Sequence, residues 1–271
     1  MTDETIDYDN VRLTFEGPLG ILKLNAPQSL NAIGEAMATD MLLALNEVVK
    51  PRRRCRGLML TGEGRAFSAG VNLMSRREAA REGKRTLEVV NGLETHYHPM
   101  LRRLHTLPIP VISAVNGLAL GIGLGVAMTG DYIVAAESAW FQAPFRNLAS
   151  APDSGLTWLL PRAIGTTRAR RMLLGAEKVD AKTALDWGLI SEVVADDCFA
   201  ERAKEVALSY ANGATLALGE IKALINDGLR SDLNTIFEAE AVAVMRTART
   251  KDNLAAVKLF ASKDRPVFTG E

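Results

Sequence analysis

The sequence is poor in the residues that usually signal metal chemistry. Its 271 residues include two cysteines, Cys55 and Cys198, and three histidines, His96, His98 and His105. The cysteines have no metal-ligand spacing and the histidines form no metal-binding motif, so we expect no bound metal ion. So few cysteines fit a reducing compartment, and we expect the protein to be cytoplasmic.

The chain also lacks an excess of charge of either sign. Lys+Arg and Asp+Glu number 32 each, which argues against a nucleic-acid partner or an acidic membrane surface. The acidic start MTDETIDYDN has the character of neither a signal peptide nor a transit peptide. The uncharged stretch Leu107–Gly130 contains Pro108, Pro110, Asn116 and several glycines, so we expect no membrane span there.

What the sequence does contain is a glycine-punctuated apolar stretch, Val111–Ala136. An apolar run of strand length breaks at Asn116-Gly117, and glycines then occupy the alternate positions 121, 123 and 125. Glycine lets other groups approach the backbone closely. The pattern predicts a buried helix whose first turn offers N–H groups to a negatively charged ligand oxygen. A buried helix that merely packs tightly is the alternative.

Strand and helix patterns alternate over the first two thirds of the chain. Val11–Asn25 predicts two strands and a turn. Apolar residues at helical spacing from Ile33 to Val48 predict an amphipathic helix. Gly57–Thr61 is a short buried strand, and another glycine-rich loop, Gly62–Leu73, follows it directly.

The rest of the chain is predominantly helical in character. The charged segment Ser75–Arg103 shows no firm core stripe, and we interpret it as a mobile cover. Beyond the glycine-rich stretch, the pattern predicts a loop-rich segment over Ala139–Trp158 and a basic helix over Thr166–Leu174. It then predicts a helix over Asp180–Trp187, capped by Asp180, and a short strand over Ser191–Val194. We therefore expect an α/β core over residues 1–197 and a helical C-terminal region over residues 198–271.

Several sequence blocks occur in order over nearly the whole chain: LKLNAPQSLNAI, GEGRAFSAGVNL, PVISAVNGLALGIG, PRAIGTTRARRMLL, ALDWGLISEVV and FASKDRPVFTG. Together they resemble the crotonase (enoyl-CoA hydratase/isomerase) superfamily. The glycines do not match the dinucleotide fingerprint, which needs GxGxxG and an acidic residue downstream. The resemblance implies a spiral core of repeated ββα units and a C-terminal region that assembles a homotrimer or a dimer of trimers. It also implies an acyl-CoA substrate that brings its own CoA, with no separate cofactor.

The resemblance further implies an oxyanion hole made by the backbone N–H groups of Val71 and Ile122. One donor comes from each glycine-rich loop, and together they hold the thioester oxygen. Removing a proton next to the thioester carbonyl places negative charge on that oxygen, and one preorganised donor stabilises it by about 3 kcal/mol. Isoleucine at position 122 departs from the glycine that the family often has there.

The two glutamates of the family's hydratases are missing from this chain. The aligned positions hold Gly125 and Phe145, which argues against hydration by the usual route. Asp153 lies further along, in FRNLASAPDSGLTWLLPRAIG, a block that resembles the isomerase branch of the superfamily. That branch includes the phenylacetate-pathway epoxide isomerase and the Δ3,Δ2-enoyl-CoA isomerases, and an acid at this position shuttles the proton. We expect apolar neighbours to shield Asp153, namely Leu148, Ala151, Pro152 and Leu156; a loop aspartate bonded to its own backbone is the alternative.

We therefore expect an acyl-CoA isomerase that moves a double bond or rearranges a ring through an enolate, with Asp153 as the single acid/base. An aryl-CoA dehalogenase-like enzyme would use the same aspartate as a nucleophile, although that branch has tryptophan where this chain has Phe145. A hydratase-like enzyme that uses Asp153 differently is another alternative. A non-catalytic protein that binds CoA esters is the last.

Further substrate contacts are implied by position for residues of both loops and for a few others: Leu30, Arg65, Ser68, Ala69, Gly70, Asn72, Gly121, Phe145, Phe260 and Lys263. Arg65 and Lys263 are candidates to contact the CoA phosphates. Phe260 lies where family members place a ring near the adenine, often from a neighbouring subunit; a core position is the alternative. We interpret Asn72 as a helix cap or a loop brace.

Overall fold

The computed structural model describes residues 4–72, 91–260 and 266–271. Its strands are β1 (Glu4–Asp7), β2 (Val11–Glu16), β3 (Leu19–Leu24), β4 (Gly57–Gly62), β5 (Ala66–Ser68), β6 (Val111–Val115), β7 (Leu118–Leu120), β8 (Tyr132–Ala136), β9 (Trp140–Gln142), β10 (Val179–Asp180) and β11 (Glu192–Val194). Its α-helices are α1 (Glu35–Val48), α4 (His98–His105), α5 (Ile122–Ala127), α6 (Leu156–Gly175), α7 (Ala181–Trp187), α8 (Phe199–Ala211), α9 (Thr215–Gly228), α10 (Leu233–Thr247) and α11 (Lys251–Leu259). The shorter helical turns are η1 (Pro27–Ser29), η2 (Pro51–Arg53), the π-helical η3 (Leu93–Tyr97) and η4 (Pro144–Leu148).

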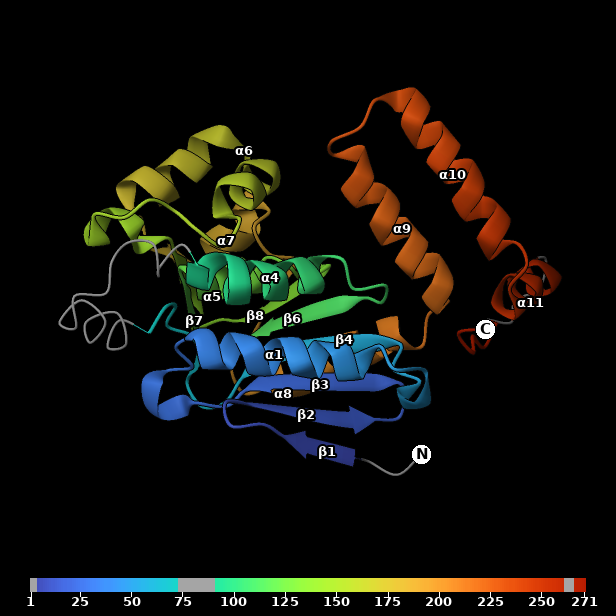
Figure 1. The fold of residues 1–271 in the computed structure, drawn as a ribbon, viewed down its shortest axis with the longest axis horizontal. Coiled ribbons are helices and arrows are strands. Elements are labelled where there is room, and N and C mark those ends of the chain that lie inside the picture. The colour runs from blue at the N-terminus through green and yellow to red at the C-terminus, as the bar shows by residue number, and fades with distance from the viewer. Residues whose placement is uncertain (1–3, 73–90, 261–265) are drawn as a thin grey trace.

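A seven-stranded sheet in the order β1-β2-β3-β4-β6-β8-β11 forms the frame of the molecule. The first three strands pair antiparallel, and every pairing from β3 to β11 is parallel. All residues of β4 and β6 are buried, as expected for parallel strands covered on both faces. Figure 1 shows α1 in front of this sheet and α8 behind it.

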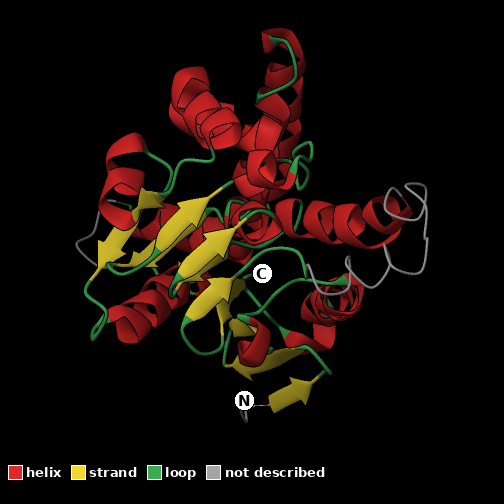
Figure 2. Cartoon of the chain, turned by 90° about the vertical axis from the view of Figure 1, so that its left-hand side faces the viewer, coloured by secondary structure: helices red, strands yellow, loops and turns green. Residues whose placement is uncertain are grey.

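A second sheet of very short strands has the order β10-β9-β7-β5, in which β5, β7 and β9 run parallel. Each of these three strands follows a strand of the large sheet: β5 follows β4, β7 follows β6 and β9 follows β8. After β7 and β9 the chain continues into α5 and α6. This repetition confirms the predicted α/β fold class with its ββα units. Figure 2 shows the strands as a twisted layer with helices beside it.

Helix α1 confirms the predicted amphipathic helix. It buries Met37, Met41, Leu45 and Val48 at helical spacing, which places one apolar stripe against the core. Ile33 lies just before the helix and forms a parallel bridge instead.

The predicted cover segment differs from its expectation where it is described. Its residues 75–90 lie outside the described ranges. The part from Leu93 to His105 is helical and buries Met100, Leu101 and Leu104, so the expected lack of a core stripe was wrong. In the described part, the stripe lies in α4, which packs against α1 and α5, and charged neighbours hide it in the sequence.

Two other expectations were partly wrong. The segment expected to be loop-rich contains β9 and η4, and α6 begins at Leu156 rather than at Thr166. Gly165, with φ of 75° and ψ of 158°, breaks the helical conformation inside α6, and Pro161 lies just before it. These two residues mask the first half of α6 as a loop when only the sequence is read.

The C-terminal helices divide into one that packs on the core and three that stand away from it. Helix α8 buries Phe199, Ala203 and Val206 against the large sheet, so the predicted boundary after residue 197 falls before a core helix. Helices α9, α10 and α11 stand apart in Figure 1. Within the described ranges, no helix combines the length and the apolar character that crossing a bilayer requires.

Candidate active site

The first glycine-rich loop leaves β5 at Ser68 and is held against the segment that precedes α1. The N–H of Ala69 donates to the carbonyl oxygen of Leu30 (2.8 Å), and the N–H of Ile33 donates to that of Gly70 (2.7 Å). Because both bonds join main-chain groups, the path of the loop depends little on its side chains.

Val71 is the residue of this loop whose N–H points away from the neighbouring segment. Ile33 and Val71 form an isolated parallel bridge, in which Ile33 bonds to the residues on either side, Gly70 and Asn72. In a parallel ladder the middle residue directs its own N–H to the opposite side. Within residues 4–72, 91–260 and 266–271, no hydrogen bond has the Val71 N–H as its donor.

The second loop ends where α5 begins, at Gly121 and Ile122. Gly121 has φ of 49° and ψ of −119°, a conformation that a residue with a side chain rarely adopts. Its N–H donates to the carbonyl oxygen of Gln142 (3.0 Å). Ile122 is the first residue of α5, and its N–H meets no acceptor in the described part of the chain. Its side chain is buried in the core, so the isoleucine contributes packing through its side chain while its N–H has no acceptor within the helix.

The two loops lie against each other at one end of the small sheet. Their strands β5 and β7 pair in parallel. A Cβ atom on Gly70 would lie 2.7 Å from the carbonyl oxygen of Leu120, and one on Gly123 would lie 2.7 Å from the Cβ of Ser68. Only glycine allows either approach. Val71 follows Gly70 and Ile122 precedes Gly123, so each lies beside one of these two close contacts between the loops.

Asp153 lies in the turn before α6, beside the helix that begins with Ile122. Its side chain is half-buried, and its Oδ1 accepts a hydrogen bond of 2.6 Å from the hydroxyl of Ser154. Ser154 is buried with φ of 61°. A Cβ atom on Gly125 of α5 would lie 2.7 Å from the Ser154 Cβ and 2.8 Å from its carbonyl oxygen. The acid therefore sits on a loop pressed directly against α5.

Residues 14–271 match the sequence profile of the family described as enoyl-CoA hydratase/isomerase. The chain belongs to the enoyl-CoA hydratase/isomerase family. It is 38% identical over 251 residues to the 1,2-epoxyphenylacetyl-CoA isomerase of Escherichia coli K12, which covers 92% of this chain and 94% of that protein. It is 30% identical over 259 residues to the short-chain-enoyl-CoA hydratase of Clostridium acetobutylicum, which covers 95% and 97% respectively.

A solved structure supports the same assignment. The enoyl-CoA hydratase/isomerase from Cupriavidus metallidurans CH34 matches this fold with a TM-score of 0.89 at 29% identity, and the match covers 98% of both chains. The predicted superfamily and fold class are confirmed. Relatives at comparable coverage include an isomerase and a hydratase, so membership of the enoyl-CoA hydratase/isomerase family does not by itself select the reaction.

At Gly125 and Phe145, the positions predicted to align with the family's hydratase glutamates, the structure leaves no room for a side chain at the first and buries the side chain of the second. Gly125 is packed so closely against Ser154 that any side chain there would displace the Asp153 loop. Phe145 is 6% exposed and belongs to the core. In this chain of the enoyl-CoA hydratase/isomerase family, positions 125 and 145 are therefore both occupied by packing contacts.

The predicted apolar shield around Asp153 is incomplete. Leu156 is buried, but Leu148, Ala151 and Pro152 are exposed. Leu148 ends η4, and Ala149 follows it with φ of 49°, a left-handed turn that takes the chain along the surface. Water therefore reaches this loop from one side.

The other predicted contacts are placed as follows. Arg65 is exposed at the turn between β4 and β5. Asn72 is half-buried close to Gly34. Phe260 is 92% exposed, so the alternative of a core position was wrong. Lys263 lies outside the described residues.

The histidines of the cover region make packing and hydrogen-bond contacts. Nδ1 of His96 lies 3.0 Å from the Oγ1 of Thr39 in α1. The ring of His105 meets Trp158 edge-on, with 5.7 Å between the ring centroids. These contacts join η3 to α1 and α4 to α6, so the side chains of His96 and His105 both have a structural role that does not depend on a substrate.

Sequence reasoning missed two residues that build the site, Ser154 and Asn31. Asn31 is fully buried with φ of 54°. Its side chain accepts from the N–H of Ala26 (2.9 Å) and donates to the carbonyl oxygens of Glu63 (2.9 Å) and Ala66 (2.8 Å). It thus joins the loops around β5. Asparagine tolerates left-handed angles better than most residues, and its place in NAPQSLNAI was the signal available.

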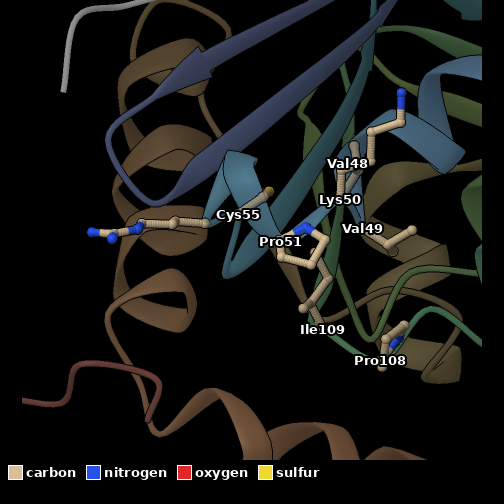
Figure 3. A pocket seen from close by; sticks show the side chains of 8 residues that line it. Val48, Val49, Lys50, Pro51, Cys55, Pro108 and Ile109 are labelled. Atoms are coloured by element: carbon tan, nitrogen blue, oxygen red, sulfur yellow. The ribbon is translucent and has the colours of Figure 1, made fainter.

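A surface pocket lies at the end of the large sheet where the central strands β4 and β6 begin (Figure 3). Its lining is Val48, Val49, Lys50, Pro51, Arg54, Cys55, Pro108 and Ile109. Burial raises the pKa of the Cys55 thiol to about 11, so the thiolate that would react is scarcely formed at neutral pH. The pocket is separate from the loops that carry Val71, Ile122 and Asp153.

Proposed function

We propose that this protein is an acyl-CoA isomerase that moves a double bond or rearranges a ring through an enolate. The observation that carries the proposal is the packing of the Asp153–Ser154 turn against Gly125. It supplies one carboxylate beside α5 and occupies the space in which a hydratase of the family would hold a glutamate. A single acid/base suffices to take a proton from one carbon and return it to another.

The reaction would proceed in two proton transfers. The N–H groups of Val71 and Ile122 donate to the thioester oxygen. The Asp153 carboxylate accepts a proton from the carbon next to the thioester carbonyl, and the electron pair of the broken C–H bond forms the enolate. The two amides stabilise the charge on oxygen. For a 3-enoyl thioester, Asp153 then returns the proton to C4, the double bond moves to C2=C3, and the carboxylate is restored.

Asp153→Asn tests this proposal because it keeps the shape of the side chain and removes the base. We would measure conversion of 3-hexenoyl-CoA and of 1,2-epoxyphenylacetyl-CoA, together with binding of hexanoyl-CoA. We expect turnover to fall by a factor on the order of 10² to 10⁴, the usual contribution of a general base, with hexanoyl-CoA binding unchanged. Asp186→Asn, on the exposed face of α7, is the control.

Three results would contradict the isomerase proposal. Undiminished turnover by the Asp153→Asn variant would remove Asp153 from the reaction. Hydration of 2-hexenoyl-CoA by the wild-type protein, without isomerisation of either probe, would favour a hydratase. A covalent ester on Asp153, trapped by mass spectrometry with an aryl-CoA halide, would favour the nucleophilic alternative.

We further propose that the C-terminal helices assemble the protein into a homotrimer or a dimer of trimers. The support is the apolar surface that these helices expose in a single chain, which includes Leu216, Ile221, Ile225, Leu229, Leu233, Phe237, Val244, Met245, Leu254, Val257 and Phe260. A contiguous exposed apolar surface marks an interaction site. Sedimentation as a monomer at micromolar concentration would contradict this proposal.

A further inference from the structure

Ser154 joins the acid to the helix that carries an oxyanion donor. Its hydroxyl donates to Asp153 Oδ1 at 2.6 Å, a short distance typical of a hydrogen bond to a charged oxygen. Its Cβ and carbonyl oxygen lie against Gly125, one turn along α5 from Ile122. One residue thus contacts both halves of the catalytic arrangement.

The backbone of Ser154 shows that its surroundings hold it firmly. It is 2% exposed and has φ of 61°, a left-handed conformation that a non-glycine residue adopts only at a cost. Such conformations persist where neighbouring contacts determine them, and they gather at functional sites. Gly155 follows with φ of 73°, so two consecutive residues of this turn have left-handed backbone angles. The serine hydroxyl and the Asp153 carboxylate therefore belong to adjacent residues of a tightly turned segment.

We propose that Ser154 is a positioning residue that holds the Asp153 carboxylate in one orientation through both proton transfers. The inference rests on the proposed isomerase function. The ionised carboxylate accepts a hydrogen bond from the serine hydroxyl at Oδ1. When Asp153 carries the substrate's proton on its other oxygen, Oδ1 becomes a carbonyl oxygen and still accepts the same bond. The acid therefore keeps its orientation while the enolate waits.

Two variants separate this role from simple packing. Ser154→Ala removes the hydroxyl and keeps the Cβ contact with Gly125. Ser154→Gly also removes the hydroxyl, but it relieves the backbone strain and opens the contact. If the hydroxyl orients the acid, kcat for 3-hexenoyl-CoA falls by about tenfold or more in both variants, as expected when a hydrogen bond to a charged group is lost. KM stays within about twofold, because the amide donors are untouched.

The fate of the transferred proton gives a second readout. In D2O, a fixed carboxylate returns much of the substrate's own proton to C4, whereas a carboxylate free to turn exchanges it with solvent first. We expect both variants to incorporate more deuterium into 2-hexenoyl-CoA per turnover than the wild-type protein does. Ser150→Ala, in the same loop but exposed, is the matched control and should change neither kcat nor deuterium incorporation.

The outcomes distinguish this inference from the function on which it rests. Equal kcat and equal deuterium incorporation in wild type, Ser154→Ala and Ser154→Gly, with Asp153→Asn inactive, would overturn the positioning role alone. A loss in one serine variant and not in the other would assign Ser154 to packing and overturn it too. Full activity of Asp153→Asn, or no isomerisation by the wild-type protein, would remove the proposed function and this inference with it.

Discussion

Gly125→Ala is the smallest change that disturbs the contact between α5 and the loop of the acid. The new Cβ would lie 2.7 Å from the Ser154 Cβ and 2.8 Å from the Ser154 carbonyl oxygen. Carbon atoms in good contact are about 3.5–4.0 Å apart. The loop that carries Asp153 must therefore shift, because the atoms it meets belong to the backbone and to a buried side chain.

Two opposing effects set the size of the stability change. Alanine in place of glycine inside a helix adds up to about 1 kcal/mol. Overpacking a tight contact costs about 1–3 kcal/mol. The net free energy of unfolding should therefore fall by roughly 0–3 kcal/mol. The effect on kcat should be larger than the effect on stability, since misplacing a reacting group by about 1 Å can cost on the order of a hundredfold in rate.

Urea unfolding and the kcat for 3-hexenoyl-CoA would measure both effects. Gly175→Ala is the control, because Gly175 lies at the end of α6 and a Cβ atom there meets nothing within 4 Å. It should raise the unfolding free energy by up to about 1 kcal/mol and leave kcat unchanged. If Gly125→Ala matched this control in both measurements, the packing of Ser154 on α5 would not set the position of the acid.

Two further predictions concern charges that hold the fold. Asp131→Asn removes the partner of Lys222, whose Nζ lies 2.8 Å from Asp131 and whose side chain is 10% exposed, so the unfolding free energy should fall by about 3 kcal/mol in urea titrations. Glu47 bonds to Lys50 and to two arginines, which lowers the pKa of its carboxyl from 4.5 to about 2. A lowered pKa stabilises the folded state above pH 4.5, and this contribution disappears as the pH falls towards 2. Glu47→Gln should therefore cost about 1–3 kcal/mol at neutral pH and almost nothing near pH 2, which unfolding curves at several pH values would show.

Each of these charge predictions has a control within the chain. Asp227 pairs with Arg230 on the surface, where both side chains are well exposed, and Asp227→Asn should cost less than about 1 kcal/mol. An equally small loss from Asp131→Asn would show that the Lys222 pair is effectively solvated. A stability difference between Glu47→Gln and wild type that stayed constant with pH would mean that packing, rather than charge, accounts for Glu47.

Local sequence patterns predicted the elements whose partners are close in the chain. Helix α1 buries the predicted stripe because its apolar residues recur every turn. The predicted cap of α7 forms, with Asp180 accepting from the N–H of Thr183 at 2.7 Å. Strands β5, β7 and β9 were not predicted, because three residues carry too little pattern. Their pairing, such as Ala66 with Leu118, depends on chain segments that only the tertiary fold brings together.

The same division applies to the candidate site. The two glycine-rich loops were predicted, since close backbone approach at positions 70 and 123 and a positive φ at position 121 each leave a glycine in the sequence. Ser154 was not, because serine at a left-handed backbone angle leaves no such mark. Asn31 was missed although asparagine is enriched at such angles. The exposure of Phe260 also could not be read from its apolar side chain, which suits a core and an interface equally.

The proposed oxyanion donors of Val71 and Ile122 belong to the main chain, and this has a genetic consequence. Nineteen of the twenty amino acids carry a backbone N–H, so a change of residue at either position swaps the side chain and spares the donor. Proline alone deletes it. Isoleucine at position 122 therefore keeps the same backbone N–H that glycine would supply. Substitutions can change the acid and the acyl pocket around the proposed anion site while its two main-chain donors remain.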